Sequence, residues 1–424
     1  MLDLFAKNRE YRSFLLFSIF LSIGEGIFGI FMMWVVHAIF QNPMYTGIAG
    51  FMFGAPKVIC FMFGPFVDKR SKASVLRTVT FIEFIVVVLV LLVSLYFQPG
   101  VWVYHLAILS VSITGLFGAP AFTAMMPRIV KGEDLIKANA LASITAIIGG
   151  LSIGIVLYLL MIRGADFSLV HGVNAVVVFI ALLFSFLIHS NETEDAKASK
   201  VAKKAYITKL KEGFSFAKKG VMLPLMVAVV SMGFFADIAY VNLPMFAQEH
   251  LGTASGYIVL SALALLGGLI GSIISRIIES KLELWKILVG CFVLAGASRI
   301  AFVNVIPNNL TRAILIYILY IGLGSAIGIF YGTLIQKLPP KNLIGRVDAV
   351  ITSLSAVAAA VGALVGGLIG TLLSNIDTVF IIQGSSYIAI GIFLCFSRSI
   401  RRLPKISEIV SDSDDDTTLR DIHL

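Results

Sequence analysis

The chain has 424 residues, of which 58% are hydrophobic and only 13% are charged, and its mean hydropathy is +0.96. A soluble domain carries about 25% charged residues, so this composition argues against an ordinary water-soluble protein and indicates a membrane protein. The net charge of +9 comes mostly from lysines and arginines between the apolar segments, so no nucleic-acid partner is expected.

Apolar segments of about 20 to 28 residues recur along the chain, and helices of this length cross a hydrocarbon core of about 30 Å. Such helices satisfy every backbone hydrogen bond internally, as lipid requires. The first segment is longer than the core of a signal peptide and lacks a small-residue cleavage site, so we expect it to be retained. Twelve membrane-spanning helices are predicted, over residues 13–39, 44–67, 74–97, 101–127, 138–162, 169–189, 221–246, 255–278, 287–306, 311–336, 347–373 and 378–396.

Basic residues are distributed unevenly between the connecting segments. With the N-terminus inside, the cytoplasmic segments and the cytoplasmic ends of the spans carry 29 of the 33 lysines and arginines. The other four are Arg163 and Arg312 in outer loops, and Lys57 and Arg299 within spans. This asymmetry predicts a multi-pass protein of the plasma membrane with both termini in the cytoplasm.

A lysine-rich segment separates the first six spans from the last six. Residues 189–220 hold eight lysines and four acidic residues, which predicts a solvated linker whose later half is able to form a short amphipathic helix. We therefore predict an N-terminal six-helix bundle over 1–189, a cytoplasmic linker over 190–220 and a C-terminal six-helix bundle over 221–397. A cytoplasmic tail follows over 398–424, and its acidic run SDSDDDTT is typical of disorder.

The two halves resemble each other in sequence. The segment DLIKANALASI (134–144) aligns with NLIGRVDAVITSL (342–354), and a parallel alignment places Asp68 opposite Glu279. Duplicated six-helix halves with a substrate site between them are the plan of a large class of transporters.

The segment FGPFVDKRSKASVLR, residues 63–77, directly follows the second predicted span. Its glycine, acid and basic residues resemble the loop signature of the major facilitator superfamily, although Ser71 stands where a second glycine is usual. The resemblance implies a cytoplasmic gate, in which the acid pairs with a basic group or helix terminus in one state and releases it in the other. Simple anchoring by positive charge is the alternative. The residues assigned to this gate are Gly64, Asp68, Lys69, Arg70 and Glu279.

The segment LIKANALASITAIIGGLSIG (135–154) is similar to the superfamily branch that holds siderophore exporters, macrolide efflux pumps and lysophospholipid flippases. Glycines occur at Gly149, Gly150 and Gly154, but the proline usual in drug–proton antiporters is missing. Glycines of this kind also predict close helix packing, here and at Gly362, Gly366, Gly367 and Gly370. The resemblance implies an all-α fold of 12 transmembrane helices in two pseudo-symmetric six-helix bundles.

Five acidic or basic residues fall well inside predicted spans, away from the span ends. A charge at the bilayer centre costs at least ~2.5–3.5 kcal/mol and needs a partner or a wet cavity. In a structural interpretation, Glu25 or Glu83 neutralises Lys57, and Asp237 neutralises Arg299. In a functional interpretation, the proton-coupling residues are Glu25, Asp237 and Glu83, and the substrate cavity includes Lys57 and Arg299. The first and seventh helices line the cavity in this superfamily, which favours a functional role for Glu25 and Asp237.

Four aromatic residues are predicted to complete a cavity for an amphipathic substrate: Phe28, Phe31, Tyr240 and Tyr331. No phosphate-binding loop, HExxH zinc pair or GxSxG nucleophile motif occurs in the sequence. The chain is therefore expected not to be an enzyme, to carry no cofactor or metal, and to draw its energy from an ion gradient.

These features predict a secondary transporter, most simply a proton-coupled exporter of a drug or siderophore that works by alternating access. Its expected partners are the amphipathic substrate, protons and membrane lipids, and a monomer is expected. A lipid or lysophospholipid flippase would share the helix-five pattern, and a non-transporting membrane sensor or immunity scaffold would share the fold.

Overall fold

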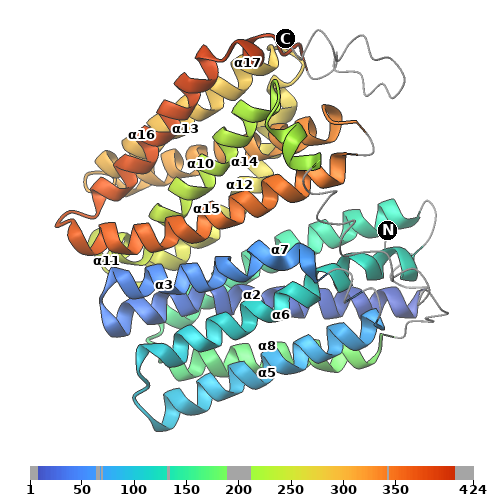
Figure 1. Ribbon diagram of the computed structural model, residues 1–424. Helices are drawn as coiled ribbons and strands as arrows, with labels where there is room; N and C mark the ends of the chain where they lie inside the picture. The colour runs from blue at the N-terminus through green and yellow to red at the C-terminus, as the bar shows by residue number, and fades with distance from the viewer. Residues whose placement is uncertain are drawn as a thin grey trace. The chain divides into compact units, whose positions relative to one another are not determined.

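The computed structural model describes residues 8–63, 67, 70–130, 134–188, 212–340 and 343–405. In this part of the chain every regular element is a helix (Figure 1). The chain divides into two compact units, one comprising Met1–Ala202 with Leu251–Ala262 and the other comprising Lys203–His250 with Leu263–Leu424. The predicted linker falls largely within 189–211, outside the described residues.

Helices occur at all twelve predicted spans. The first six spans correspond to α2 (Arg9–Phe40), α3 (Pro43–Gly54) with the 3₁₀-helix η1 (Ala55–Met62), α5 (Lys72–Tyr96), α6 (Val101–Ile129), α7 (Asp134–Ile162) and α8 (Phe167–Phe186). The others correspond to α10 (Met222–Tyr240) with α11 (Leu243–Leu251), α12 (Ala254–Ile278), α13 (Leu284–Val305), α14 (Leu310–Lys337), α15 (Ile344–Leu372) and α16 (Asp377–Phe396), before the short α17 (Arg398–Arg401).

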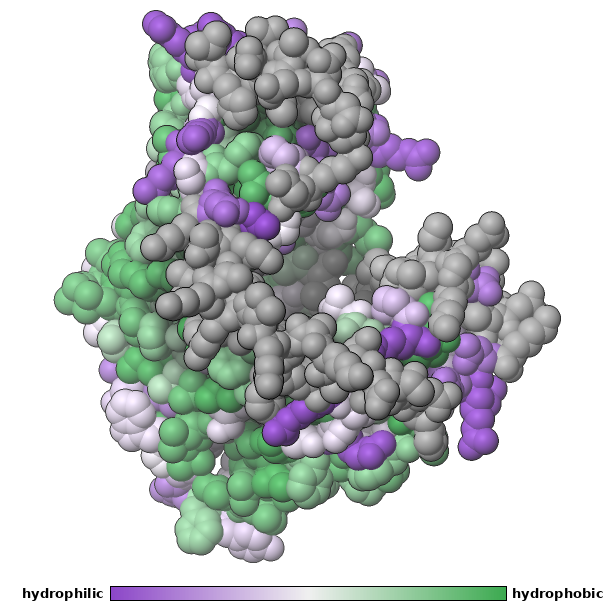
Figure 2. Space-filling view, turned by 45° about the vertical axis from the view of Figure 1, so that its right-hand side comes forward, coloured by the Kyte–Doolittle hydropathy of each residue, from purple (hydrophilic) through white to green (hydrophobic). Residues whose placement is uncertain are grey.

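Ten of these helices are long and apolar enough to cross a membrane, counted over the described residues: α2, α5, α6, α8, α10, α12, α13, α14, α15 and α16. Figure 2 shows large continuous areas of hydrophobic side chains on the surface, and hydrophilic side chains gathered in separate groups. Many large apolar side chains are exposed on these helices, for example Leu315 (63%) and Ile273 (59%). A water-soluble fold rarely exposes so many large apolar side chains. The chain is therefore a multi-pass membrane protein.

In the first unit α2 occupies a central position, because it contacts α3, α6, α7 and α8, while α5 contacts α6 and α8. The N-terminal end of α2 is packed through aromatic side chains, with the rings of Phe14 and Phe122 stacked at 4.9 Å. Tyr11 is fully buried there, and its hydroxyl donates to the carbonyl of Ala138 on α7 at 3.1 Å. These contacts hold α2, and any charged residue on it, in a defined rotation.

In the second unit α13 packs against α14 and α16, and α10 packs against α15 and α16. Two glycines of α15 lie directly on the backbone of α10. A Cβ atom at Gly362 would lie 2.3 Å from the carbonyl oxygen of Phe234, and one at Gly366 would lie 2.6 Å from that of Ile238. The predicted packing role of these two glycines is confirmed.

The predicted single span over 221–246 is wrong, because α10 ends at Tyr240 and α11 begins at Leu243. Pro244 has no backbone N–H and its ring clashes with the carbonyl four residues earlier, so a continuous helix is disfavoured here. Asn242 is 1% exposed and occupies the break, where its Nδ2 donates to the carbonyls of Ile238 and Gly366, both at 2.8 Å. At its other end α11 is held by His250, whose Nε2 lies 2.6 Å from Oδ1 of Asp377 on α16.

We expect Asn242→Ala to lower the free energy of unfolding by about 1–3 kcal/mol, because it removes both donors from a buried helix break. Asn304→Ala is the matched control, since Asn304 makes the same bond to the fourth preceding carbonyl (Ile300, 2.8 Å) at an exposed site. Thermal unfolding of the purified variants in detergent measures the difference. Equal effects of the two substitutions would contradict a special role of Asn242.

The end of the linker is described from residue 212 and contains a helical turn over 212–217, as predicted for its later half. Gly213 lies against the start of α15, where a Cβ atom would come within 2.7 Å of the Arg346 carbonyl oxygen. Glu212 forms an ion pair with the guanidinium of Arg346. The linker thus ends on the second unit, at the N-terminus of α15.

Candidate functional site

A cluster of charged side chains lies inside the first unit and joins three helical segments. Glu25 of α2 interacts electrostatically with Lys57 of η1, and it also interacts with Glu83 of α5. Glu83 is only 5% exposed and accepts a hydrogen bond from the hydroxyl of Thr114 on α6 at 2.6 Å. The structure thus brings together three of the five ionisable residues that were predicted as site residues.

The backbone explains how these side chains come to meet. Pro56 follows Gly54 closely and cannot donate a backbone hydrogen bond, so the α-helix gives way to η1 and carries Lys57 on a tighter turn. Glu25 lies 16 residues from Arg9, the first residue of α2, which is about 24 Å along the helix at 1.5 Å per residue. Glu25 and Lys57 are both exposed, whereas the neighbours Gly24 and Ile27 are buried.

The exposed Glu25 carboxylate, so far along α2, needs polar or charged groups around it. A carboxylate that faced lipid at this depth would cost at least ~2.5 kcal/mol. Glu25 instead interacts electrostatically with the Lys57 ammonium and with a second carboxylate, Glu83. Such a group of two acids and one base is able to bind and release a proton as its surroundings change.

Arg299 has a different environment in the second unit. It is 3% exposed, and its Nε donates to Oε1 of Gln383 on α16 at 2.9 Å. Its guanidinium lies over the rings of Phe380 (4.5 Å) and Tyr320 (4.7 Å), while Tyr320 in turn accepts a bond from Gln383 Nε2 at 2.8 Å. One guanidinium nitrogen, Nη1, has no hydrogen-bond partner among the described residues. The contact of Arg299 with substrate stays a prediction.

The other predicted residues of the second unit lie on α10 and α14. Asp237 is partly exposed on α10, and Tyr240 is 43% exposed at the end of the same helix. Tyr331 lies on α14, within electrostatic reach of Asp348, and its buried hydroxyl has no hydrogen-bond partner in the described part of the chain. Their roles in proton coupling and substrate contact stay predictions.

Phe28 and Phe31 lie in the packed interior of the first unit, each only 2% exposed. The ring of Phe28 packs edge-on against Phe53 with 6.5 Å between centroids. The ring of Phe31 packs against His171 of α8, with 5.1 Å between centroids. Any contact of Phe28 or Phe31 with substrate requires a rearrangement of these packed rings.

Of the predicted cytoplasmic gate, Gly64, Asp68 and Lys69 lie outside the described residues, and Arg70 and Glu279 are exposed. The described part of the loop is organised by Lys72, which is 2% exposed. Its Nζ donates to the carbonyls of Val67 at 3.0 Å and Arg70 at 3.1 Å. The basic residue therefore fixes the backbone of the loop, and the gate itself stays a prediction.

The sequence profile described as Major Facilitator Superfamily matches residues 14–363. The chain belongs to this superfamily. Among curated proteins no sequence match is found.

Solved structures of transporters in this superfamily share the fold. A POT family transporter in complex with 5-aminolevulinic acid is 15% identical, with a TM-score of 0.71 over 93% of this chain and 97% of that chain. The nucleoside transporter NupG is 13% identical, with a TM-score of 0.69 over 91% of this chain and 98% of that chain. The xylose transporter XylE from E. coli, in an inward open conformation, is 12% identical, with a TM-score of 0.68 over 94% and 98%. The fold is therefore the all-α fold of a superfamily of transporters.

Two residues of this superfamily member were not anticipated as part of the site. Thr114 bonds directly to Glu83, and Asn174 of α8 lies beside Gly24 with its side-chain oxygen inside the unit. Both were detectable in principle as polar side chains in apolar segments. Periodicity along one helix does not tell which neighbouring helix a side chain faces, so neither was selected.

Proposed function

We propose that this protein is a proton-coupled secondary transporter that exports an amphipathic organic compound by alternating access. The observation that supports it most is the cluster of Glu25, Lys57 and Glu83, in which two acids and one base of the first unit interact electrostatically. Superfamily membership supports transport as such. The proposal includes that the protein lies in the plasma membrane and that both of its termini lie in the cytoplasm.

In the proposed cycle Glu25 takes up a proton from the outside, which removes one negative charge from the cluster. Lys57 is then left to pair with Glu83, and the changed charge balance releases the substrate. On the inside the proton leaves, and the ionised Glu25 again favours the state that binds substrate. Asp237 on α10 is the second candidate for this role, because it is partly exposed on a membrane-spanning helix.

The substrate class rests on the side chains that are exposed on the site helices. Tyr240 presents an aromatic ring, and Lys57 presents an ammonium group. Within its own unit, an exposed aromatic face is able to bind the apolar part of a compound, and an exposed ammonium group is able to bind a polar part.

The proposal is tested in everted membrane vesicles that are acidified inside and contain a quenched pH-sensitive dye. Cationic drugs, macrolides and siderophores are added in turn, and exchange of a substrate for protons restores the fluorescence. We expect at least one class to do so only in vesicles that contain the protein. Movement of a fluorescent lysophospholipid between leaflets, with no change in the dye signal, would instead establish the flippase alternative.

A further inference from the structure

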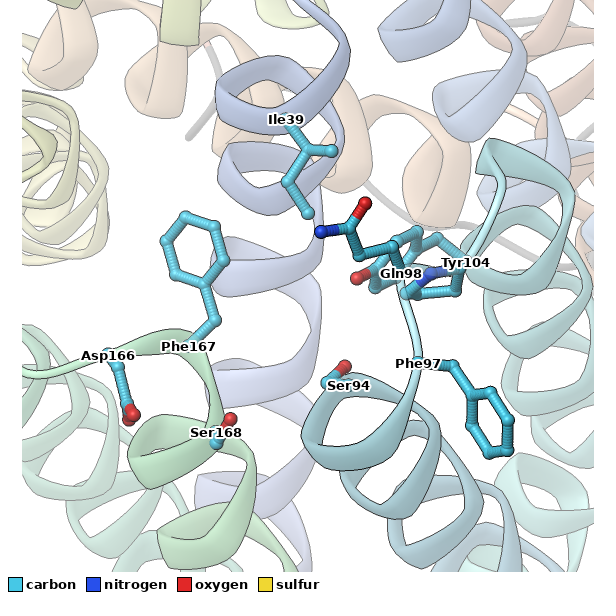
Figure 3. Close-up of a pocket in the computed structure, with 9 residues that line it drawn as sticks. Ile39, Ser94, Phe97, Gln98, Tyr104, Asp166, Phe167 and Ser168 are labelled. Atoms are coloured by element: carbon cyan, nitrogen blue, oxygen red, sulfur yellow. The ribbon is translucent and has the colours of Figure 1, made fainter.

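A pocket of about 370 Å³ opens at the outer end of the first unit (Figure 3). Its walls come from four helices, through Ile39 of α2, Ser94 of α5, Tyr104 of α6, and Phe167 and Ser168 of α8. Asp166, the N-cap residue of α8, stands at its rim and accepts a bond from the backbone N–H of Leu169 at 2.7 Å. The pocket therefore sits above the seam along which α2 and α8 pack.

Two buried polar side chains of α8 follow this pocket into the membrane. His171 comes three residues after Ser168, and Asn174 comes three residues after His171, so each step is about 4.5 Å along the helix axis. They are 2% and 1% exposed. His171 Nε2 and Asn174 Oδ1 have no hydrogen-bond partner among the described residues. A buried polar atom without a protein partner is a characteristic position for an ordered water.

Asn174, the residue further from the pocket, lies beside the part of α2 that carries the charged cluster. A Cβ atom at Gly24 would lie 3.5 Å from Oδ1 of Asn174, so the amide oxygen points at the part of α2 that carries Glu25. His171 lies one turn further out, against the ring of Phe31. The pocket, the imidazole and the amide thus follow one another along α8, and the amide oxygen ends beside Gly24, the residue that precedes Glu25 on α2.

We propose that the α2–α8 seam is the route by which protons reach Glu25 from the outside, by way of the pocket, His171 and Asn174. The proposal rests on the role of Glu25 in the proposed function. A hydrated proton (hydronium) in the pocket is taken up by one ring nitrogen of His171, and the opposite nitrogen releases its own proton. A water held by Asn174 Oδ1 accepts that proton and passes one to the Glu25 carboxylate, so one proton is moved and nothing else is consumed. Rotation of the neutral imidazole then restores the starting tautomer.

Other titratable groups lie on the elements that pack around this route. They are His37 on α2, Asp166 before α8, Glu83 on α5 and Lys57 on η1. Asp166 at the rim attracts cations toward the pocket. Lys57 and Glu83 act at the inner end only, through their interactions within the cluster that contains Glu25. None of these groups substitutes for His171 at its position between pocket and cluster.

The first test follows the protonation of Glu25 by infrared spectroscopy after an external pH jump, in oriented proteoliposomes. The carboxylic-acid band is assigned with Glu25→Gln. We expect His171→Phe and Asn174→Leu to slow its appearance by about tenfold or more, because a relay group is lost from the path. The control is His105→Phe on α6, where a fully buried histidine contacts the carbonyl of Tyr45 at 2.9 Å, away from the seam. Unchanged rates in both seam variants overturn the route, whereas absence of a Glu25 band overturns the proposed proton site as well.

The second test is independent of proton coupling and of the folding of His171→Phe. In a protein with Cys60, Cys291 and Cys395 replaced by serine, a cysteine is placed at Asn174 (Asn174→Cys) or at Val176 (Val176→Cys). Val176 is two residues away and 59% exposed on the outside of α8, so it faces lipid and serves as the control. We expect a small water-soluble thiol reagent, added outside, to modify position 174 at least about tenfold faster, because only a hydrated thiol forms the reactive thiolate. Equal or slower modification at 174 overturns the route even where Glu25 proves to be the proton site.

Discussion

Glu25→Gln is expected to reduce proton-coupled transport by about a hundredfold or more, because a positioned acid–base group commonly contributes that much to a proton-transfer step. Glutamine keeps the size of the side chain but cannot gain or lose a proton, so the interaction with Lys57 no longer changes during the cycle. The measurement is the dye response in energised vesicles, with a compound that the unaltered protein exchanges for protons. Folding and insertion should be unaffected, because the side chain is exposed.

The control for this experiment is Glu10→Gln, which removes a carboxylate from the exposed first turn of the same helix. It should leave the response within experimental error of the unaltered protein. Asp237→Gln separates the two candidate proton sites. If Glu25→Gln retains full coupling while Asp237→Gln abolishes it, the proton site belongs to the second unit and the cluster around Lys57 is structural.

The second large effect is expected at the crossing of α10 and α15. Gly366→Ala should lower the free energy of unfolding by about 1–3 kcal/mol, since overpacking of a close contact forces the helices apart. The added methyl group would lie 2.6 Å from the carbonyl oxygen and 2.7 Å from Cα of Ile238, and neither atom is able to move without the backbone. Thermal unfolding in detergent, together with the yield of inserted protein, measures the loss.

Gly328→Ala on α14 is the matched control, because nothing lies within 4 Å of a Cβ atom at that position. Alanine is favoured over glycine in a helix interior by about 0.8–1.0 kcal/mol, so the control should be neutral or stabilising. Only Gly366→Ala is thus expected to lower the free energy of unfolding. A neutral Gly366→Ala would mean that α10 and α15 pack less closely than the structure has them.

The approximate positions of the apolar helices follow from the amino-acid sequence, because hydropathy is a local property summed over a window. Each of the twelve predicted segments contains helical structure, and the superfamily suggested by FGPFVDKR is confirmed. The break before α11 was missed, although Pro244 was visible. A proline is compatible with either a kinked or an interrupted helix, and the buried amide of Asn242 decides between them by bonding to α15.

The pairing of the buried groups was decided only by the tertiary structure. The sequence left open whether Glu25 or Glu83 accompanies Lys57, and the packing of α2, η1 and α5 places all three within electrostatic reach. The sequence indicated that Arg299 needs a partner, but it did not indicate that aromatic rings would surround the guanidinium. Hydropathy determines that a segment lies in the membrane, whereas the rotation of each helix depends on contacts with segments a hundred or more residues away, and that rotation determines which polar groups meet.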